Sequence, residues 1–121
     1  MRHNLRETEG LNMPIARIIM GEQFSPEGTK QLLEDHRRAC VDGFLKVADF
    51  SVAVRTGEAS FLIVTVYETE KLADSNKEAR RKWLEERSHL ICEDFYYEGE
   101  VATLIKGGGE PLLSKYPAKL A

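Results

Sequence analysis

Five residues of this chain combine side-chain chemistry and spacing that favour work on a small molecule. His36, Tyr67 and Arg87 are the predicted catalytic residues. An imidazole titrates near neutral pH, so His36 is suited to moving a proton, as is the phenol of Tyr67. A guanidinium such as Arg87 can stabilise negative charge that develops on a substrate. Trp83 and Asn76 are predicted to bind the ligand, by ring stacking and through a polar contact.

Four of these residues also have a purely structural interpretation, which the sequence leaves open. His36 lies on the apolar stripe of a helical pattern, where a hydrogen-bonded core histidine is common. Trp83 could serve only as a core anchor, and Tyr67 could lie at the rim of a subunit interface. Asn76 could simply sit at the edge of its helix.

Arg87 falls on the inward side of its predicted helix, where an unpaired charge is costly. It therefore either forms an ion pair, with Asp35, Glu34 or a carboxylate of a partner, or orients an anionic ligand. The basic run 80–82 on the same helix is flanked by glutamates and is interpreted as a solvated helix face.

No metal or cofactor motif accompanies these candidates, so none is predicted. His3, His36 and His89 are scattered and lack the spacing of a zinc site. The two cysteines, Cys40 and Cys92, are too few for a disulfide framework and too far apart for a metal motif. We interpret them as buried, reduced thiols of a cytoplasmic protein, which agrees with an N-terminus that has no apolar signal segment.

Composition narrows the choice of partners. The 121 residues carry a formal net charge of −3, which argues against binding to nucleic acid or to an anionic membrane. No apolar run approaches the roughly 18 residues that a membrane span needs. The predicted partners are therefore a small molecule and a second copy of the chain, with no nucleic acid and no membrane.

The hydrophobic pattern predicts the elements that must position the candidate residues. Their order, β-α-β-β-α-β, is that of the ferredoxin-like α+β fold, a four-stranded antiparallel sheet with two helices on one face. Alternating runs predict strands over 15–24, 49–55, 60–67 and 98–105, and runs of helical period predict helices over 26–41 and 70–92.

Local signals mark the ends of these elements and of the domain. Ser25, before a proline, is the expected N-cap of the first helix, Gly43 its left-handed C-cap, and Thr69 the N-cap of the second helix. We divide the chain into an N-terminal extension, a ferredoxin-like domain and a C-terminal tail. The three segments cover residues 1–13, 14–106 and 107–121.

Both faces of the first and third predicted strands are apolar. The helices cover one face of such a sheet, so the other would be an exposed apolar surface. A second copy that packs sheet against sheet with two-fold symmetry would cover it. The pattern thus predicts a homodimer.

Three segments of the chain together resemble the dimeric α+β barrel superfamily, and within it the antibiotic biosynthesis monooxygenase-like family. These segments are the first strand at 16–20, the turn at 42–45, and the strand-to-helix junction at 61–72. The resemblance covers about residues 15–105. It implies a small dimeric protein with a ligand between sheet and helices. Members include cofactor-free oxygenases of polycyclic aromatic substrates, haem-degrading enzymes and isomerases.

The family pattern is only partly present. Its cofactor-free oxygenases use an asparagine, a tryptophan, a tyrosine and an arginine, at positions that match Ile63, Tyr67, Ala73 and Arg87 here. Only the arginine is retained, and Tyr67 is an aromatic substitute. The haem-binding histidine of other members lies on the second helix, where His89 falls off the inward stripe.

Two functional hypotheses follow, and the sequence leaves both open. The first is a cofactor-independent monooxygenase or isomerase that acts on a small apolar or aromatic molecule through His36, Tyr67 and Arg87. The second is a non-catalytic ligand-binding or assembly protein on the same fold. A pocket around the candidate residues would favour the first.

Overall fold

The computed structural model describes residues 13–114 of the chain. Four strands, three α-helices and one short 3₁₀ helix follow one another in the described part in the order β-α-β-β-α-β, with the second helix in two pieces. The elements are β1 (Ile15–Gln23), α2 (Pro26–Asp42), η1 (Phe44–Val47), β2 (Phe50–Gly57), β3 (Ser60–Tyr67), α3 (Glu70–Ser75), α4 (Lys77–Glu86) and β4 (Ile91–Glu100).

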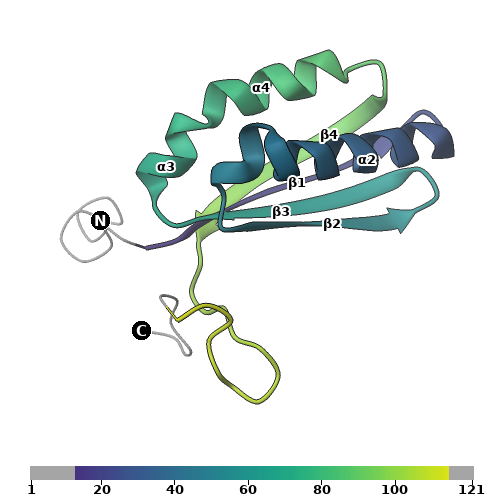
Figure 1. Cartoon of the computed structure of the whole chain (residues 1–121). Helices are drawn as coiled ribbons and strands as arrows, with labels where there is room; N and C mark the ends of the chain where they lie inside the picture. Colours follow the sequence, from purple (N-terminus) through teal and green to yellow (C-terminus); the bar gives the residue numbers. More distant parts are fainter. Residues whose placement is uncertain (1–12, 115–121) are drawn as a thin grey trace.

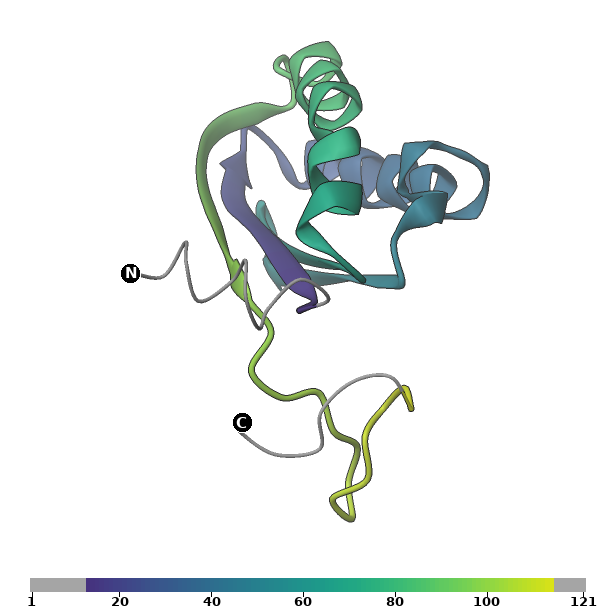
Figure 2. The same cartoon turned by 90° about the vertical axis from the view of Figure 1, so that its left-hand side faces the viewer.

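The four strands form one antiparallel sheet in the order β2-β3-β1-β4. All three helices lie on the same face of this sheet, with α2 and the α3–α4 pair side by side (Figures 1 and 2). The predicted ferredoxin-like α+β fold is therefore confirmed. The helices and the face they cover enclose the buried side chains, and no helix of residues 13–114 lies on the opposite face.

The first helix begins where the sequence predicts. The Ser25 side chain accepts a hydrogen bond from the backbone N–H of Gly28 at 3.0 Å, and Pro26 occupies the first turn. The end of this helix differs from the prediction. Gly43 has an extended backbone, with φ of −103°, rather than a left-handed one. A glycine is needed there for space, because a Cβ would lie 2.8 Å from the Cα of Ala39.

The predicted helix over 70–92 is wrong in two respects. It is broken at Asn76 into α3 and α4, and it ends at Glu86. The N–H groups of Arg87 and Ser88 bond to carbonyls three residues back, which tightens and closes the last turn.

The last strand begins seven residues before the predicted one and ends at Glu100 rather than at 105. Aromatic residues at 95–97 favour a strand, and β4 pairs with β1 along nearly its whole length. The residues 90–97 fit both the helical period and the alternation of a strand. Their pairing with β1, and not their own pattern, therefore decides that they form a strand.

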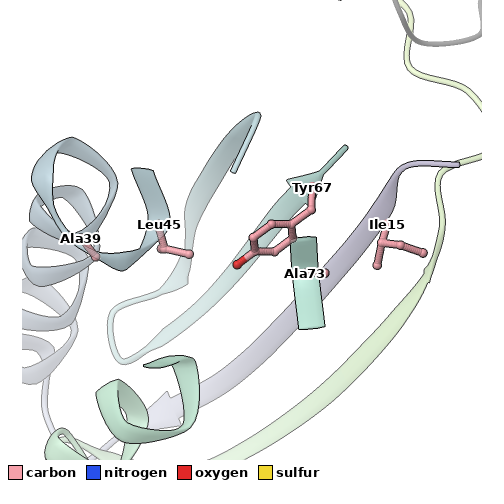
Figure 3. Packing of buried hydrophobic residues seen from close by; sticks show 5 residues of the cluster. All are labelled: Ile15, Ala39, Leu45, Tyr67 and Ala73. Atoms are coloured by element: carbon pink, nitrogen blue, oxygen red, sulfur yellow. The ribbon is translucent and has the colours of Figure 1, made fainter. Parts of the chain in front are cut away.

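Two clusters of buried residues hold the helices on the sheet. One comprises Leu32 of α2 with Phe61 and Ile63 of β3, which Trp83 contacts from α4. In the other, the Tyr67 ring packs between the α2–η1 side and the α3 side of the core (Figure 3). Its members are Ile15, Ala39, Leu45, Tyr67 and Ala73.

Beyond β4, residues 101–114 form an arm that leads away from the sheet and helices (Figures 1 and 2). A small turn in this arm is closed by a bridge between Ile105 and Pro111. The predicted domain limits, 14 and 106, stay a prediction, and most of the extension 1–13 and part of the tail 107–121 lie outside the described residues. In the range 13–114 the helices are too short or too polar to span a membrane.

The cysteine prediction is wrong in one part. Both cysteines are free thiols, as expected, but Cys92 is exposed and Cys40 only partly buried. Cys92 lies on the edge strand β4, whose outer edge has no neighbouring strand in the sheet.

Candidate functional site

A pocket lies between the helix-covered face of the sheet and the helices. Its cavity volume is about 40 Å³, within about 420 Å³ of space between atoms when the mouth is included. The cavity itself has room for a few water molecules, so an organic ligand has to occupy the mouth as well. Its lining is mostly apolar and aromatic, with a few polar groups, as in typical small-molecule sites. The lining residues are Arg17, Ile19, His36, Phe44, Leu45, Ile63, Thr65, Tyr67, Arg80, Trp83, Leu84 and Tyr96.

His36 enters this pocket from the middle of α2. Its Nε2 lies 2.8 Å from Ser51 Oγ, which in turn lies 2.7 Å from the hydroxyl of Thr65, another lining residue. Burial lowers the pKa of His36, so the imidazole is neutral at neutral pH. A neutral imidazole can accept a proton, and the two hydroxyls connect it to the pocket wall.

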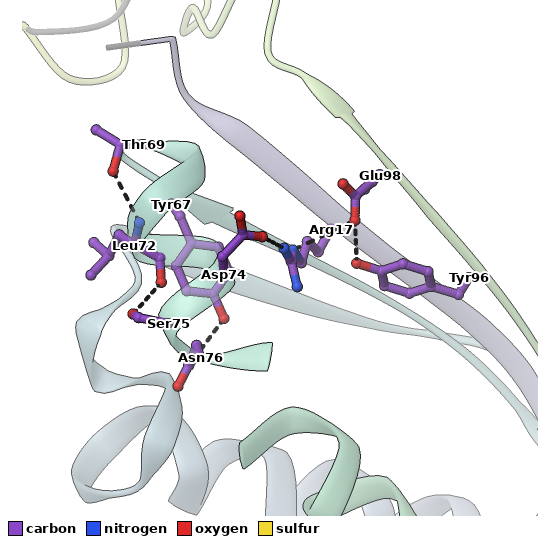
Figure 4. A network of polar contacts seen from close by, with 9 residues as sticks. All are labelled: Arg17, Tyr67, Thr69, Leu72, Asp74, Ser75, Asn76, Tyr96 and Glu98. Atoms are coloured by element: carbon purple, nitrogen blue, oxygen red, sulfur yellow. Dashed lines mark hydrogen bonds and ion pairs between the residues drawn. The ribbon is translucent and has the colours of Figure 1, made fainter. Parts of the chain in front are cut away.

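Tyr67 reaches the pocket from the end of β3, and its side chain is among the most buried in the structure, at 1% exposed. Its hydroxyl accepts a hydrogen bond from the amide of Asn76 at 2.7 Å (Figure 4). Burial raises the pKa of Tyr67, while the Asn76 bond and the nearby Arg17 and Arg80 charges lower it. Because Asn76 is the donor in this bond, the hydroxyl proton remains able to bond a ligand.

Asn76 itself does not line the pocket. It is 7% exposed and occupies the break between α3 and α4, where it positions the Tyr67 hydroxyl. The direct ligand contact predicted for Asn76 stays a prediction, and the described contact acts through Tyr67.

Trp83 forms part of the apolar wall, beside Phe44 with ring centroids 6.1 Å apart. The guanidinium of Arg87 stacks over the Trp83 ring at 4.3 Å and bonds Asp35 through Nε at 3.0 Å. Of the two roles that the sequence leaves open for Arg87, the structure shows the ion pair, with Asp35 as the partner. Arg87 and Asp35 line a second, more open groove, and neither lines the pocket described above.

Two other arginines supply positive charge to the pocket. Arg17 of β1 pairs with Asp74 at 2.7 Å, and its Nε lies 3.8 Å from Glu98 (Figure 4). Arg80 of α4 lies over the ring of Tyr96, with its guanidinium carbon 4.3 Å from the ring centroid. Tyr96 donates its hydroxyl to Glu98 at 2.9 Å. Burial, with that bond, raises the pKa of Tyr96 to about 12.

The pocket thus brings together three of the five predicted residues, His36, Tyr67 and Trp83. Asn76 and Arg87 do not line it, and its positive charge comes from Arg17 and Arg80. The basic run 80–82 predicts a solvated position for Arg80, but the structure places Arg80 in the pocket lining. Arg80 precedes Trp83 by three residues, a spacing that puts both on one side of a helix. Arg17 shares its strand face with Ile19, which follows from alternation. The residues that contact these two arginines, such as Asp74 for Arg17 and Tyr96 for Arg80, could not be predicted from the sequence, because these contacts depend on packing.

Metal and thiol chemistry have no visible basis in the described part of the chain. No group of three or more histidine, cysteine or acidic side chains there could hold a metal ion. Cys40 Sγ lies 3.6 Å from His36 Nε2, but burial raises the pKa of its thiol and so disfavours the reactive thiolate.

The opposite face of the sheet is mainly apolar, apart from Glu22 and Glu93 at one end of β1 and β4. Apolar residues on neighbouring strands are paired across this face. Ile18 of β1, for example, pairs with Val64 of β3 on one side and with Tyr97 of β4 on the other. Val64 in turn pairs with Val52. Several of these side chains are strongly exposed, including Val52, Val54, Phe95 and Tyr97. A continuous exposed apolar surface of this kind marks an interaction site.

Comparison with known proteins identifies the fold alone. No protein-family model matches the chain, and no curated protein matches it in sequence. Among solved structures, it is similar to a protein of unknown function from Nitrosomonas europaea. Their TM-score is 0.63 at 12% identity, covering 83% of this chain and 100% of that one.

Two further solved structures are similar. A dimeric ferredoxin-like protein from an uncultured marine organism has a TM-score of 0.62 at 11% identity, covering 83% of this chain and 97% of that one. The protein PA3566 from Pseudomonas aeruginosa has a TM-score of 0.57 at 11% identity, covering 75% and 96%. The chain therefore has the ferredoxin-like α+β fold, which is also the fold of a dimeric protein.

Proposed function

We propose that this protein is a cofactor-independent enzyme, an isomerase or monooxygenase of the kind found in the family that the sequence resembles. Its substrate is a small, mostly apolar molecule, aromatic or enolisable. The observation that carries the proposal is one pocket with apolar walls that is lined by both a neutral histidine, His36, and a buried tyrosine hydroxyl, Tyr67.

The first step common to both reactions is removal of a proton from the substrate, which leaves an enolate or a phenolate. His36 takes this proton, because its imidazole is neutral and its Nε2 is linked to Thr65 through Ser51. Tyr67 donates a hydrogen bond to the oxygen on which negative charge develops. An isomerase returns the proton to another carbon atom. In a monooxygenase the carbanion reduces O₂, one oxygen atom stays on the carbon as a carbonyl, and the other leaves as water.

Positive charge near the pocket stabilises the anion. The role was predicted for Arg87, and it stays a prediction for that residue, which pairs with Asp35 and stacks over Trp83. Arg17 and Arg80 line the pocket and meet the same requirement at shorter range. Positive charge fixed in a site with apolar walls acts more strongly than the same charge in water.

Exchange of carbon-bound hydrogen tests the proposal without knowledge of the natural substrate. Phenylpyruvate and phenylacetone, two enolisable aromatic probes, are incubated in D₂O with the protein, and loss of their methylene signal is followed by ¹H NMR. We expect exchange faster than in buffer with at least one probe. The double variant His36→Gln, Tyr67→Phe should lower that rate by about 100-fold or more while the fold is retained.

Exchange at the buffer rate with both probes, or an unchanged rate in the double variant, would contradict the enzyme proposal. The alternative is then the non-catalytic ligand-binding protein. One observation favours it: His36 and Arg17 already have polar partners within the chain, in Ser51 and Asp74. That alternative predicts tight binding of a small molecule with no chemical change in it.

We further propose that two copies pair through the apolar sheet face. The support is the apolar surface of the open face, which is most exposed on β2 and β4, and the similarity in fold to a dimeric protein. Light scattering at micromolar concentration should give twice the chain mass, and a mass of one chain would contradict the proposal. The cytoplasmic location expected from the two free cysteines remains part of this proposal.

A further inference from the structure

The wall of the pocket carries positive charge without negative charge. Two of its lining residues are arginines, Arg17 on β1 and Arg80 on α4, and none is an aspartate or a glutamate. The remaining lining groups are aromatic, aliphatic or neutral polar. The acidic partners of Arg17, Asp74 and Glu98, are not part of the wall and are themselves about half exposed.

Each of the two arginines has a buried donor with no hydrogen-bond partner. The Nε of Arg17 is buried, and the nearest carboxylate oxygen, on Glu98, is 3.8 Å away, which is too far for a hydrogen bond. Glu98 instead accepts the hydroxyl of Tyr96. The Nε of Arg80 is also buried without a partner. Leaving a buried charged donor unpaired is costly, so each such group calls for an explanation.

Arg80 is the more telling of the two, as its neighbour in the sequence shows. Arg81 pairs with both Glu78 and Glu85 on the surface of α4. Within residues 13–114, Arg80 forms no ion pair, and the structure places its guanidinium over the ring of Tyr96. An arginine that lies over a ring, lines the pocket and forms no ion pair with the glutamates of its own helix can pair with an anion in that pocket.

We infer that the pocket binds an aromatic carboxylate, with its acid group between Arg17 and Arg80 and its ring against Trp83. A carboxylate accepts charge-assisted hydrogen bonds on both oxygens and matches the donor groups of a guanidinium, so it can pair with the two arginines that line the pocket. The wall formed by Trp83, Phe44 and Leu84 suits an aromatic body. This inference rests on the proposed function, since it assigns the substrate class of the same pocket.

The single tryptophan makes the test direct, because Trp83 lines the pocket and is the only Trp of the chain. Its fluorescence is titrated with benzoate and with benzamide, which has nearly the same shape but no charge. We expect benzoate to bind about tenfold or more tightly than benzamide, given the strength of charge-assisted hydrogen bonds. In Arg80→Gln this preference should fall to about threefold or less.

The matched control is Arg81→Gln, which removes the same charge one position along α4, outside the pocket lining. It should keep the preference for benzoate, and an equal loss in both variants would overturn the inference. If Arg80→Gln fails to fold, Arg80→Lys takes its place. It keeps the charge but lacks the Nε–H, so it should weaken benzoate by about threefold and leave benzamide unchanged.

The outcomes separate this inference from the proposed function. Equal binding of benzoate and benzamide by the unaltered protein would show that the pocket takes neutral ligands. The carboxylate inference would then be wrong, and the enzyme proposal would stand on the hydrogen-exchange result. If neither probe changes the fluorescence and neither probe of the exchange assay reacts, the pocket has no such function and both proposals fail.

Discussion

The two faces of the sheet are built by the same strands and differ in almost every other respect. On the helix-covered face, β1 presents Arg17 and Ile19 to a pocket that also contains a histidine and a tyrosine. On the open face, the same strand presents Ile18 and Met20 to a surface made of aliphatic and aromatic side chains. The first face contains the pocket, and the second is a mainly apolar surface.

The cause of this difference lies in the geometry of a single strand. Side chains alternate along a strand, so neighbouring residues serve opposite faces. Polar groups are tolerated on the helix-covered face because helices supply them with partners, such as Asn76 for Tyr67. No helix of the described part of the chain lies on the open face, and the residues there gain most by packing on another apolar surface.

The largest expected effect comes from placing a charge on the open face. Val52 is 49% exposed in the single chain and lies opposite Val64 on β3. Val52→Lys should weaken the dimer by about 3 kcal/mol or more, roughly 100-fold in Kd, since it buries a lysine in both copies. Analytical ultracentrifugation measures this change.

The control for that variant is Val41→Lys, the same substitution on the surface of α2, where the side chain is 67% exposed. It should leave the dimer intact. If Val52→Lys remains a dimer as tight as the unaltered protein, the sheet face is not the interface. The open face would then have no role in assembly.

A smaller effect is expected from one hydroxyl on the helix-covered face. Tyr67→Phe removes the acceptor for the buried amide of Asn76 and leaves that amide without a partner. The free energy of unfolding should fall by about 1–3 kcal/mol, as measured by urea denaturation. Tyr97→Phe makes the same change on the open face, where the tyrosine is 56% exposed, and should cost less than about 0.5 kcal/mol. Equal losses would contradict the assigned role of the Tyr67–Asn76 bond.

The smallest effect is a pH dependence of stability that comes from His36. Its pKa is lowered in the folded protein, so the unfolded chain binds this proton more readily. The stability associated with neutral His36 is thus fully present above about pH 6.5. It is lost as the pH falls through the folded pKa. His36→Asn should flatten this part of the stability profile, and an NMR titration of the imidazole should give a midpoint below 6.5. A midpoint above 6.5 would reverse the sign and contradict this account.

Much of the fold could be predicted because its signals are local or periodic. Ser25 caps α2, and Thr69 caps α3 by accepting the N–H of Leu72 at 3.1 Å. The alternation along 60–67 predicts β3 without error in its bounds. The limits of the last helix and strand could not be predicted, because the run around 90–97 fits both periods and only pairing with β1 selects the strand.

The candidate site was predictable only in part, for a related reason. His36, Tyr67 and Trp83 were found because an inward stripe and a strand end are visible as patterns. Arg80 and Arg87 could not be told apart in this way, since both are three or four residues from Trp83. The predicted helix continued through Arg87, whereas α4 ends before it and its guanidinium turns to Asp35.

The sequence by itself determined the order of the elements, the starts of α2 and α3 and the presence of an apolar sheet face. Propensity, capping and periodicity act over a few residues, so the local sequence is enough to predict their effects. The tertiary structure alone decided which arginines line the pocket, that Asn76 serves Tyr67, and that two guanidinium donors stay unpaired. These properties depend on the register of strands and the packing of helices, which bring together residues as far apart as Arg17 and Arg80.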